Sequence, residues 1–565
     1  MEAGAILLTS GLLDERQIQA AREAQRDGTR LDQVAVQLGM VSEEQVLAAW
    51  GEQFGWEVVD LQSAEVDTSI LADFPLKLVH RHGVFPIRRE GDVLVVATSD
   101  PFDLYALDKV GTATSLTVRP VLAAAGEIAR LVKAHLGVGS ETIDSLMARN
   151  AQRGGDVEIL DELELDGSEA SEMAQEASVV RLVNDILVAA VEARASDIHL
   201  EAQSTGLRIR YRIDGILQTQ PTPPEINRFQ AAIVSRLKIM ARLNIAEKRL
   251  PQDGRIKLKV FGREIDVRVS IIPMLHGEGI VMRVLDKDRM QFDLRGVGLD
   301  EDVYRQFRQL IQLPHGIILV TGPTGSGKTT TLYSALNEIK SDATKIITTE
   351  DPVEYHLEGI NQIQVHAKIG LTFAASLRGI LRHDPDVVLV GEIRDRETAE
   401  NAVQASLTGH MVFSTLHTND AAGAYVRLCD MGIEPFLVAG TVEGVMAQRL
   451  VRTLCVDCRE AHRPNADDVP PDFPLDEVKK RDVPIYRAVG CRECRGTGYR
   501  GRAGVFELLV SSDELRQLAH DRASSQQLKQ VAVRQGMRSL RQDGWRKVLA
   551  GTTSIAEAMR ATRAD

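Results

Sequence analysis

The stretch "ILVTGPTGSGKTTTLYSAL" spans Ile318 to Leu336, and an apolar run ends there in a glycine-rich turn. The turn satisfies the pattern G-x-x-x-x-G-K-[ST] directly after a predicted strand and directly before a predicted helix. Glycines let backbone N–H groups turn inward around phosphate oxygens, and the helix N-terminus adds a favourable dipole. The stretch therefore predicts a binding site for a nucleoside triphosphate.

Two side chains of this turn have separate expected roles. Lys328 is expected to reach the β- and γ-phosphates of ATP, and the Thr329 hydroxyl is expected to bind Mg²⁺. The predicted nucleotide-binding residues are Gly322, Pro323, Thr324, Gly325, Ser326, Gly327, Lys328, Thr329 and Thr330.

The residues around the turn alternate buried strands with helices, as in "GIILVTG", "KIITTED", "DVVLVGE" and "HMVFSTLH". This order is typical of a mainly parallel sheet with crossover helices. One strand, "DVVLVGEIRD", places Glu392 just beyond its end, where a carboxylate would hold or position the Mg²⁺ water shell. An aspartate is more usual at that place, so Glu392 departs from the common pattern.

A second strand ends in "TTEDPVEY", which puts Glu350, Asp351 and Glu354 in one short turn. Carboxylates this close repel one another unless a cation or basic group lies among them. We expect Glu354 to polarise the attacking water. The alternative is a solvated acidic turn with no catalytic role.

Histidines and arginines complete the set of candidate catalytic residues. The segment "TGHMVFSTLHTN" puts His417 at the carboxyl edge of the sheet, where ligands of open α/β sheets bind. It is predicted to sense the γ-phosphate or contact water, although strand histidines are often structural. Phosphoryl transfer commonly uses an arginine, and Arg255 and Arg268, in "PQDGR" and "DVRVS", are the candidates. The alternative is that most arginines of these strands lie on solvated strand faces.

The five cysteines include two pairs with metal-binding spacing. Cys455 and Cys458 form one C-x-x-C pair, Cys491 and Cys494 form another, and Cys429 is left over. Two such pairs can complete a closed tetrahedral zinc site, which would be structural because it has no open coordination position. The 32 intervening residues exceed the usual spacing of about 15 to 20, which indicates an inserted subdomain. A redox role is the alternative.

Bulk composition bounds the class of protein. A chain of 565 residues is too long to fold around a single hydrophobic core, so several domains are expected. Of its residues, 44% are hydrophobic and 26% are charged. A net charge of −13 argues against general nucleic-acid binding. No segment reaches the roughly 18 apolar residues of a membrane span, and "MEAGAILLTSGLLDER" lacks the features of a signal peptide. A cytoplasmic location is therefore expected.

Several motifs together resemble the type II/type IV secretion ATPase superfamily, most closely the type II secretion system ATPase (general secretion pathway protein E). They are "GPTGSGKTTTLY", "EDPVEY", "LRHDPDVVLVGEIRD", "ASLTGHMVFSTLHTN" and "CRECRGTGYRGRAGVFELL", preceded by "ASDIHLE", "YRIDGIL", "AEKRLPQDGRI" and "DVRVS". The resemblance runs from about Val179 to the C-terminus.

The resemblance implies a homo-hexameric ATPase in which arginines of the preceding domain reach the phosphates, in agreement with Arg255 and Arg268. It implies attachment to the inner membrane through a membrane-anchored partner bound by the N-terminal domain, and through a polytopic platform protein. Hydrolysis would drive assembly of a periplasmic pseudopilus that expels folded proteins. Type IV pilus assembly ATPases share every motif and are the alternative. A nucleic-acid translocase is disfavoured by the acidic balance and by 4% aromatic residues.

The N-terminal residues contain a repeat with an offset of 28 positions, in which Gly11 and Asp14 correspond to Gly39 and Ser42. Each copy is interpreted as a turn glycine, an N-cap and an amphipathic helix. The stretch from Arg30 to Gln53 resembles the cyclic-di-GMP-binding element of some pilus and secretion ATPases. Asp32 stands where that element has a glycine, and its carboxylate would repel a phosphate. Docking to the membrane partner is therefore favoured over dinucleotide binding.

The expected fold is α/β and multidomain, with a RecA-like P-loop ATPase core. The predicted divisions are an N-terminal partner-docking domain (1–140, with a helical repeat at 1–60 and a small α/β part at 61–140), an acidic flexible linker (141–178), a second N-terminal α/β domain contributing arginines (179–290), the ATPase core (291–450), a tetracysteine zinc subdomain (451–505) and a C-terminal helical domain (506–565).

Overall fold

The computed structural model of the chain describes residues 3–25, 30–61, 66–72, 74, 78–79, 82–136, 157–159, 177–286, 292–481 and 484–563. The chain divides into two compact units, Met1–Asp288 and Arg289–Asp565. Most of the predicted linker 141–178 lies outside the described residues. Its residues 157–159 form a short strand, β4 (Val157–Ile159), which pairs with β8 of the first unit.

The N-terminal helices show the predicted repeat. Asp14 accepts a hydrogen bond from the Gln17 N–H at 2.8 Å, and Ser42 accepts one from the Gln45 N–H at 3.2 Å, each in a reciprocal capping box. The turn glycines before both caps have φ of +69°. The helices are α1 (Ala3–Thr9), α2 (Glu15–Ala24), α3 (Leu31–Gln37) and α4 (Glu43–Phe54).

A small α/β part follows the repeat, as predicted. Its three strands pair in the order β1-β2-β3, and apolar residues of β1 and β2 pack beneath its helices. Its elements are η1 (Thr68–Ala72), β1 (Val84–Glu90), β2 (Val93–Thr98), α6 (Leu104–Thr114), β3 (Thr117–Leu122) and α7 (Ala125–Leu136).

The rest of the first unit is a mixed α/β region with an antiparallel sheet, in the order β4-β8-β9-β10-β5-β6-β7. One face of this sheet packs on α10 and α11 around a continuous apolar core. The elements are α10 (Ala177–Glu192), β5 (Ala195–Gln203), β6 (Gly206–Ile213), β7 (Ile216–Thr219), η2 (Pro224–Phe229), α11 (Gln230–Met240), β8 (Gln252–Val260), β9 (Arg263–Met274) and β10 (Gly277–Asp286).

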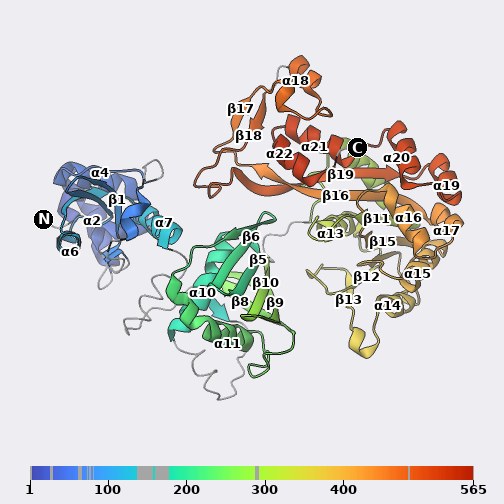
Figure 1. The fold of residues 1–565 in the computed structure, drawn as a ribbon, viewed down its shortest axis with the longest axis horizontal. Coiled ribbons are helices and arrows are strands. Elements are labelled where there is room, and N and C mark those ends of the chain that lie inside the picture. The colour runs from blue at the N-terminus through green and yellow to red at the C-terminus, as the bar shows by residue number, and fades with distance from the viewer. Residues whose placement is uncertain are drawn as a thin grey trace. The chain divides into compact units, whose positions relative to one another are not determined.

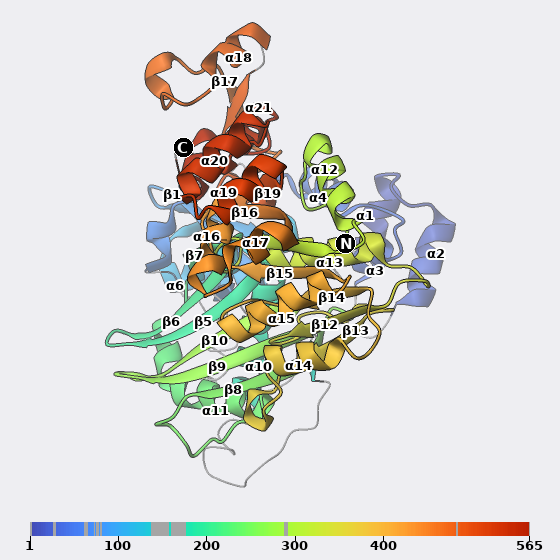
Figure 2. The same ribbon diagram turned by 90° about the vertical axis from the view of Figure 1, so that its right-hand side faces the viewer.

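The second unit contains the predicted parallel sheet with helices on both faces (Figure 2). Its strand order is β13-β12-β14-β15-β11-β16-β19, and only β19 runs antiparallel to its neighbour. The strands are β11 (Gly316–Thr321), β12 (Ile346–Glu350), β13 (Asn361–Gln364), β14 (Val387–Val390), β15 (Met411–Leu416), β16 (Val442–Leu454) and β19 (Tyr499–Val510).

Helices cover that sheet on two sides. Apolar residues of α12 and α13 pack on one face, and those of α14 to α17, α19 and α20 pack on the other. The helices are α12 (Glu301–Ile311), α13 (Lys328–Ile339), η4 (Ala367–Ile369), α14 (Phe373–Ile380), α15 (Arg396–Leu407), α16 (Ala422–Asp430), α17 (Pro435–Thr441), α19 (Asp513–His520), α20 (Ser525–Arg534), α21 (Leu540–Leu549) and α22 (Ile555–Ala561).

The cysteine-bearing insert leaves the sheet between β16 and β19, which run side by side into it (Figure 1). It contains β17 (Glu460–His462), η5 (Ala466–Asp468), α18 (Leu475–Arg481) and β18 (Ile485–Arg487). The predicted core boundary at residue 450 falls inside β16. Residues Tyr499–Val510, which the predicted divisions split between the insert and the tail, form the edge strand of the core sheet.

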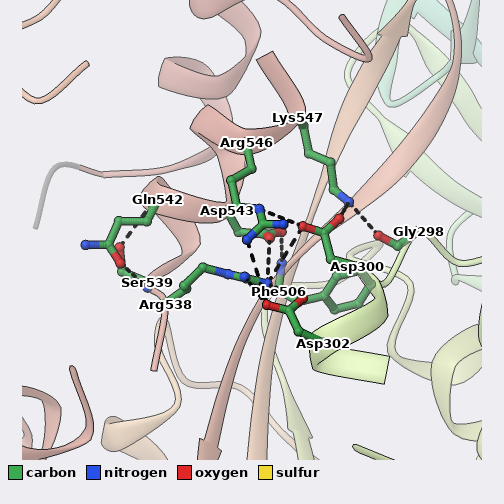
Figure 3. A network of polar contacts seen from close by, with 10 residues as sticks. All are labelled: Gly298, Asp300, Asp302, Phe506, Arg538, Ser539, Gln542, Asp543, Arg546 and Lys547. Atoms are coloured by element: carbon green, nitrogen blue, oxygen red, sulfur yellow. Dashed lines mark hydrogen bonds and ion pairs between the residues drawn. The ribbon is translucent and has the colours of Figure 1, made fainter. Parts of the chain in front are cut away.

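A polar network fastens the C-terminal helices to the core (Figure 3). Lys547 of α21 donates to Asp300 and to the Gly298 carbonyl at 2.7 Å each, and Arg546 pairs with Asp300 at 2.9 Å. Arg538 pairs with Asp302. The helical tail is therefore bound to the N-terminal end of α12 by several charged contacts.

Candidate active site

The glycine turn lies between β11 and α13, as predicted. Gly322, Gly325 and Gly327 have φ of +147°, +76° and +90°, a region that favours glycine. The Ser326 hydroxyl is shielded from water and has no hydrogen-bond partner among the described residues. A buried polar atom without a partner, within a loop of this conformation, fits a phosphate ligand.

Lys328 begins α13 and folds back over the turn. Its ammonium group donates to the carbonyls of Gly322 at 2.9 Å and Pro323 at 3.1 Å. Burial lowers the pKa of Lys328, and the negative charge of Glu392 opposes that shift. The next residue, Thr329, is exposed at the N-terminus of the helix. Both side chains are therefore available to a ligand at the turn.

The structure brings together two candidates that come from different strands. Glu392 follows β14 and His417 follows β15, and the His417 Nε2 lies 3.3 Å from a Glu392 carboxylate oxygen. Arg394 pairs with the other carboxylate oxygen at 2.5 Å. Glu392 is also close enough to influence the Lys328 ammonium. Lys328, Glu392 and His417 thus form one group at the carboxyl edge of the sheet.

The loop that carries His417 is fixed directly to the base of the glycine turn. The Thr418 N–H donates to the Thr321 hydroxyl at 2.8 Å, and the two threonine hydroxyls lie 2.7 Å apart. Thr321 is the last residue of β11 and directly precedes the glycine turn, so the same residue anchors both the turn and the loop that carries His417.

The acidic turn after β12 contains two different kinds of glutamate. Glu350 is buried and accepts hydrogen bonds from the hydroxyls of Tyr333 and Thr348 and from the Gln362 amide. Such a set of neutral donors indicates a structural role. Glu354 is half-buried in the turn itself. Burial and the Glu350 charge raise the pKa of Tyr333, which keeps its hydroxyl a donor.

The two candidate arginines lie in the first unit, directly opposite each other on β8 and β9. The row continues across the sheet in register to Arg283, Asp197 and Arg212. Asp197 contacts Arg283 at 3.3 Å and Arg212 at 3.5 Å, and Asp266 pairs with Arg255 through both carboxylate oxygens. The row thus places Arg255, Arg268 and Arg283 on adjacent strands, each directly opposite another cation. Like charges opposite each other destabilise a sheet, so this row suits an anionic ligand.

One residue near the turn was not predicted from the sequence. Arg449 of β16 lies beside Gly322, where a carbon added to the glycine would be 3.3 Å from the Arg449 Nη1. The sequence signal was an arginine in an otherwise buried strand, "VMAQRLV", which alone does not indicate proximity to the turn.

The four paired cysteines converge in the insert as predicted. Their sulfur atoms all lie within 4.8 Å of one another, and three of the separations are 3.7 to 3.8 Å. Zinc–sulfur bonds of about 2.3 Å in a tetrahedron place sulfurs about 3.8 Å apart. Burial would raise the pKa of Cys494, but N–H donors from Cys491 and Gly498 lower it to about 7. The set fits a zinc ion.

In the N-terminal domain, Asp32 forms an ion pair with Arg30, two positions before it. Arg30 donates to both Asp32 carboxylate oxygens at 3.1 and 2.8 Å, and it also pairs with Asp100. The guanidinium lies 5.0 Å from the ring centres of both Trp50 and Phe102. These contacts place Arg30 between two carboxylates and two aromatic rings of the same domain.

Comparison with known proteins decides the family. The profile described as "Type II/IV secretion system protein" matches residues 172–560, more than half of the chain. The chain belongs to this family. A second profile, "MshEN domain", matches residues 54–142. The chain is therefore a secretion-family ATPase that hydrolyses ATP, with the predicted α/β multidomain fold.

Relatives with names from type II secretion and from type IV pilus assembly are similar to this chain, two of them over nearly their whole length. "Type II secretion system protein E" of Xanthomonas campestris is 42% identical over 98% of this chain and 97% of its own. "Type IV pilus assembly ATPase PilB" of Myxococcus xanthus is 42% identical over 100% and 99%. "Type II secretion system ATPase E" of Vibrio cholerae is 51% identical over 69% and 77%.

A solved structure supports the fold. The X-ray structure of the Legionella pneumophila ATPase DotB is 21% identical, with a TM-score of 0.50, and covers 71% of this chain and 99% of its own. Within the described residues, no helix is long and apolar enough to cross a membrane.

Proposed function

We propose that this ATPase powers type II protein secretion by driving pseudopilus assembly at the inner membrane. The observation that carries the proposal is the similarity to proteins named for type II secretion, both along the whole chain and, at higher identity, over most of it. The relationship to a pilus assembly ATPase makes pilus extension the competing outcome of the test below.

In the proposed reaction, the glycine turn from Gly322 to Thr330 holds the phosphates of ATP, and Lys328 exchanges its two loop carbonyls for phosphate oxygens. Thr329 and Glu392 would hold Mg²⁺, which neutralises developing charge on the phosphates. Glu354 would polarise the attacking water. His417, 3.3 Å from Glu392, would link the γ-phosphate to the residue that holds the metal.

The arginine row would supply positive charge to the transition state. Arg255 and Arg268 lie in register with Arg283, so an anion placed over this face would contact several guanidinium groups at once. We propose that the phosphates of ATP are that anion and that the working assembly is a homo-hexamer. Neutralising the row would also remove the repulsion between its like charges.

The four cysteines would hold a structural zinc ion, because a closed set of four thiolates has no position for a reacting ligand. The N-terminal domain would bind a membrane-anchored partner, and the motor would also contact a polytopic platform protein. These contacts would place a cytoplasmic protein at the inner membrane.

The test is Lys328→Ala in the native host, with exoprotein release and surface pili scored in parallel. Loss of release with normal pili is expected. Lys368→Ala, an exposed lysine on η4, is the matched control and should leave release normal. Loss of pili with normal release would assign the protein to pilus assembly, and no change in either would contradict the motor role.

A further inference from the structure

Strand β16 continues past the point at which β11 gives way to the glycine turn. Thr321, the last residue of β11, is in register with Ala447, and β16 then carries Gln448 and Arg449 alongside the turn. A carbon added to Gly322 would lie 2.5 Å from the Gln448 carbonyl and 3.3 Å from the Arg449 Nη1. Arg449 is therefore packed against the first residue of the turn.

Arg449 is a cation held by neutral groups. Its Nη2 lies 3.2 Å from both the carbonyl and the side-chain oxygen of Asn419. Its Nη1 is shielded from water and has no hydrogen-bond partner, and within the described parts of the chain no carboxylate is paired with it. Burial and the charge of Arg563 lower its pKa, although the group stays protonated at neutral pH.

The position of this cation beside the turn suggests what it responds to. A buried donor without a partner is unfavourable, and a nearby anion relieves that cost. Phosphate oxygens bound at the turn would bring negative charge close to the guanidinium. Lys328 is in a similar state, because among the described residues its ammonium group has only the two loop carbonyls within hydrogen-bonding distance.

Asn419 connects Arg449 to the catalytic group. It directly follows Thr418, which is hydrogen-bonded to Thr321, and it lies two residues after His417. His417 in turn contacts Glu392 at 3.3 Å. One guanidinium thus joins the glycine turn to the loop that places His417 and Glu392.

We propose that Arg449 is a positioning residue that couples phosphate occupancy of the glycine turn to the placement of His417 and Glu392. It acts through Asn419. Bound phosphate stabilises the charged guanidinium beside Gly322, and the two contacts to Asn419 hold the His417 loop at the distance needed for hydrolysis. The inference depends on the ATPase activity and is independent of whether the motor serves secretion or pili.

The test compares Arg449→Ala, Asn419→Ala and the double variant in the purified full-length chain. We expect each single variant to lower kcat about tenfold or more, because a displaced catalytic group loses near-attack geometry. The dissociation constant for ADP should rise, because its phosphates lose a nearby positive charge, but by clearly less than kcat falls, since Lys328 and the backbone N–H groups still bind them. The double variant should be no slower than the slower single variant, because both act as one unit.

Controls separate this role from a general packing role. Arg396→Ala removes an exposed arginine of α15 that pairs with Glu400, and it should leave kcat and ADP affinity unchanged. Should Arg449→Ala fail to fold, Arg449→Lys keeps the charge, but its single ammonium cannot contact both Asn419 oxygens and the turn together, so kcat should still fall. The proposal is overturned by a normal kcat in both Arg449→Ala and Arg449→Lys. It is also overturned by losses that multiply in the double variant, or by ADP affinity falling in step with kcat.

Discussion

At the scale of single residues, two glutamates four positions apart have different surroundings. Glu350 is buried and accepts hydrogen bonds from Tyr333, Thr348 and Gln362, whereas Glu354 lies in the turn beyond the strand. The sequence "TTEDPVEY" cannot distinguish them, because the donors come from α13, β12 and β13. Only the folded sheet assigns the structural role to Glu350.

We therefore expect Glu354→Gln to lower ATP turnover by a factor of about 10² to 10⁴, the usual range for loss of a general base, while ATP still binds. Glu350→Gln should instead lower the free energy of unfolding by about 1–3 kcal/mol, because the new side-chain NH₂ group would be buried against the donors that now contact Glu350. Steady-state kinetics, nucleotide titration and denaturant unfolding measure the two effects. Full stability together with lost turnover in Glu350→Gln would reverse the assignment.

Asp543 in the network of Figure 3 predicts a pH dependence of stability. Burial raises its pKa from 3.8 to about 6, opposed by Lys547 and by the Phe506 N–H, which donates at 2.9 Å. A carboxyl whose pKa is raised by folding favours the folded state while protonated. That contribution is present below about pH 4 and is lost as the pH rises to about 6, by at most about 3 kcal/mol.

The measurement is the free energy of unfolding of the wild type minus that of Asp543→Asn between pH 4 and 7. The asparagine keeps an acceptor for Phe506 and cannot titrate, so the difference should decrease as the pH rises and become constant above about 6. Fluorescence of Trp545, with the other two tryptophans replaced by phenylalanine, reports the helix that carries the site. A difference that is independent of pH would show that Arg538 and Lys547 cancel the effect of burial.

At the scale of elements, we expect the cysteine insert to depend on the proposed zinc ion. Its apolar cluster is small and is completed by Trp545, Val548 and Ala558, which belong to the C-terminal helices. A structural zinc ion contributes on the order of 10 kcal/mol to such sites. We expect Cys455→Ser to release the metal and to abolish hydrogen-exchange protection in β17, α18 and β18.

Cys429→Ser is the matched control for that change, because Cys429 lies on α16, outside the cluster of four thiols. It should retain one zinc per chain by metal analysis and keep normal protection. If Cys455→Ser also retained zinc and protection, the insert would be held by packing alone.

The sequence predicted the core strands better than it predicted their limits. Strands β11, β12, β14 and β15 are apolar runs that end in glycine or polar residues, so their positions and the residues at their ends could be read directly. Strand β19 could not, because the insert separates it from its partner β16 and its first half is rich in glycine and arginine. Arg449 was missed because its contacts, Gly322 and Asn419, come from other segments of the chain.

At the scale of the whole molecule, the proposed hexamer makes a prediction about mixed assemblies. If neighbouring copies must act together, an inactive Lys328→Ala subunit also disables its neighbours. Adding this variant to a fixed amount of wild-type chain should therefore lower total ATPase activity below that of the wild type alone. The same amount of Lys368→Ala should raise the activity. Unchanged activity after adding Lys328→Ala would indicate that the copies work independently.

Strand β16 has a mechanical consequence for the whole ATPase unit. Its 13 residues span about 40 Å, it is paired with β11 at one end and with β19 along most of its length, and Cys455 directly follows its last residue. A strand held by hydrogen bonds on its edges resists stretching and cannot bend freely. Because β16 cannot slide past β11 and β19 without breaking those hydrogen bonds, the segment from Arg449 to Cys455 belongs to one stiff unit with the sheet. A change in the sheet at the glycine turn would therefore also change the position of the cysteine cluster.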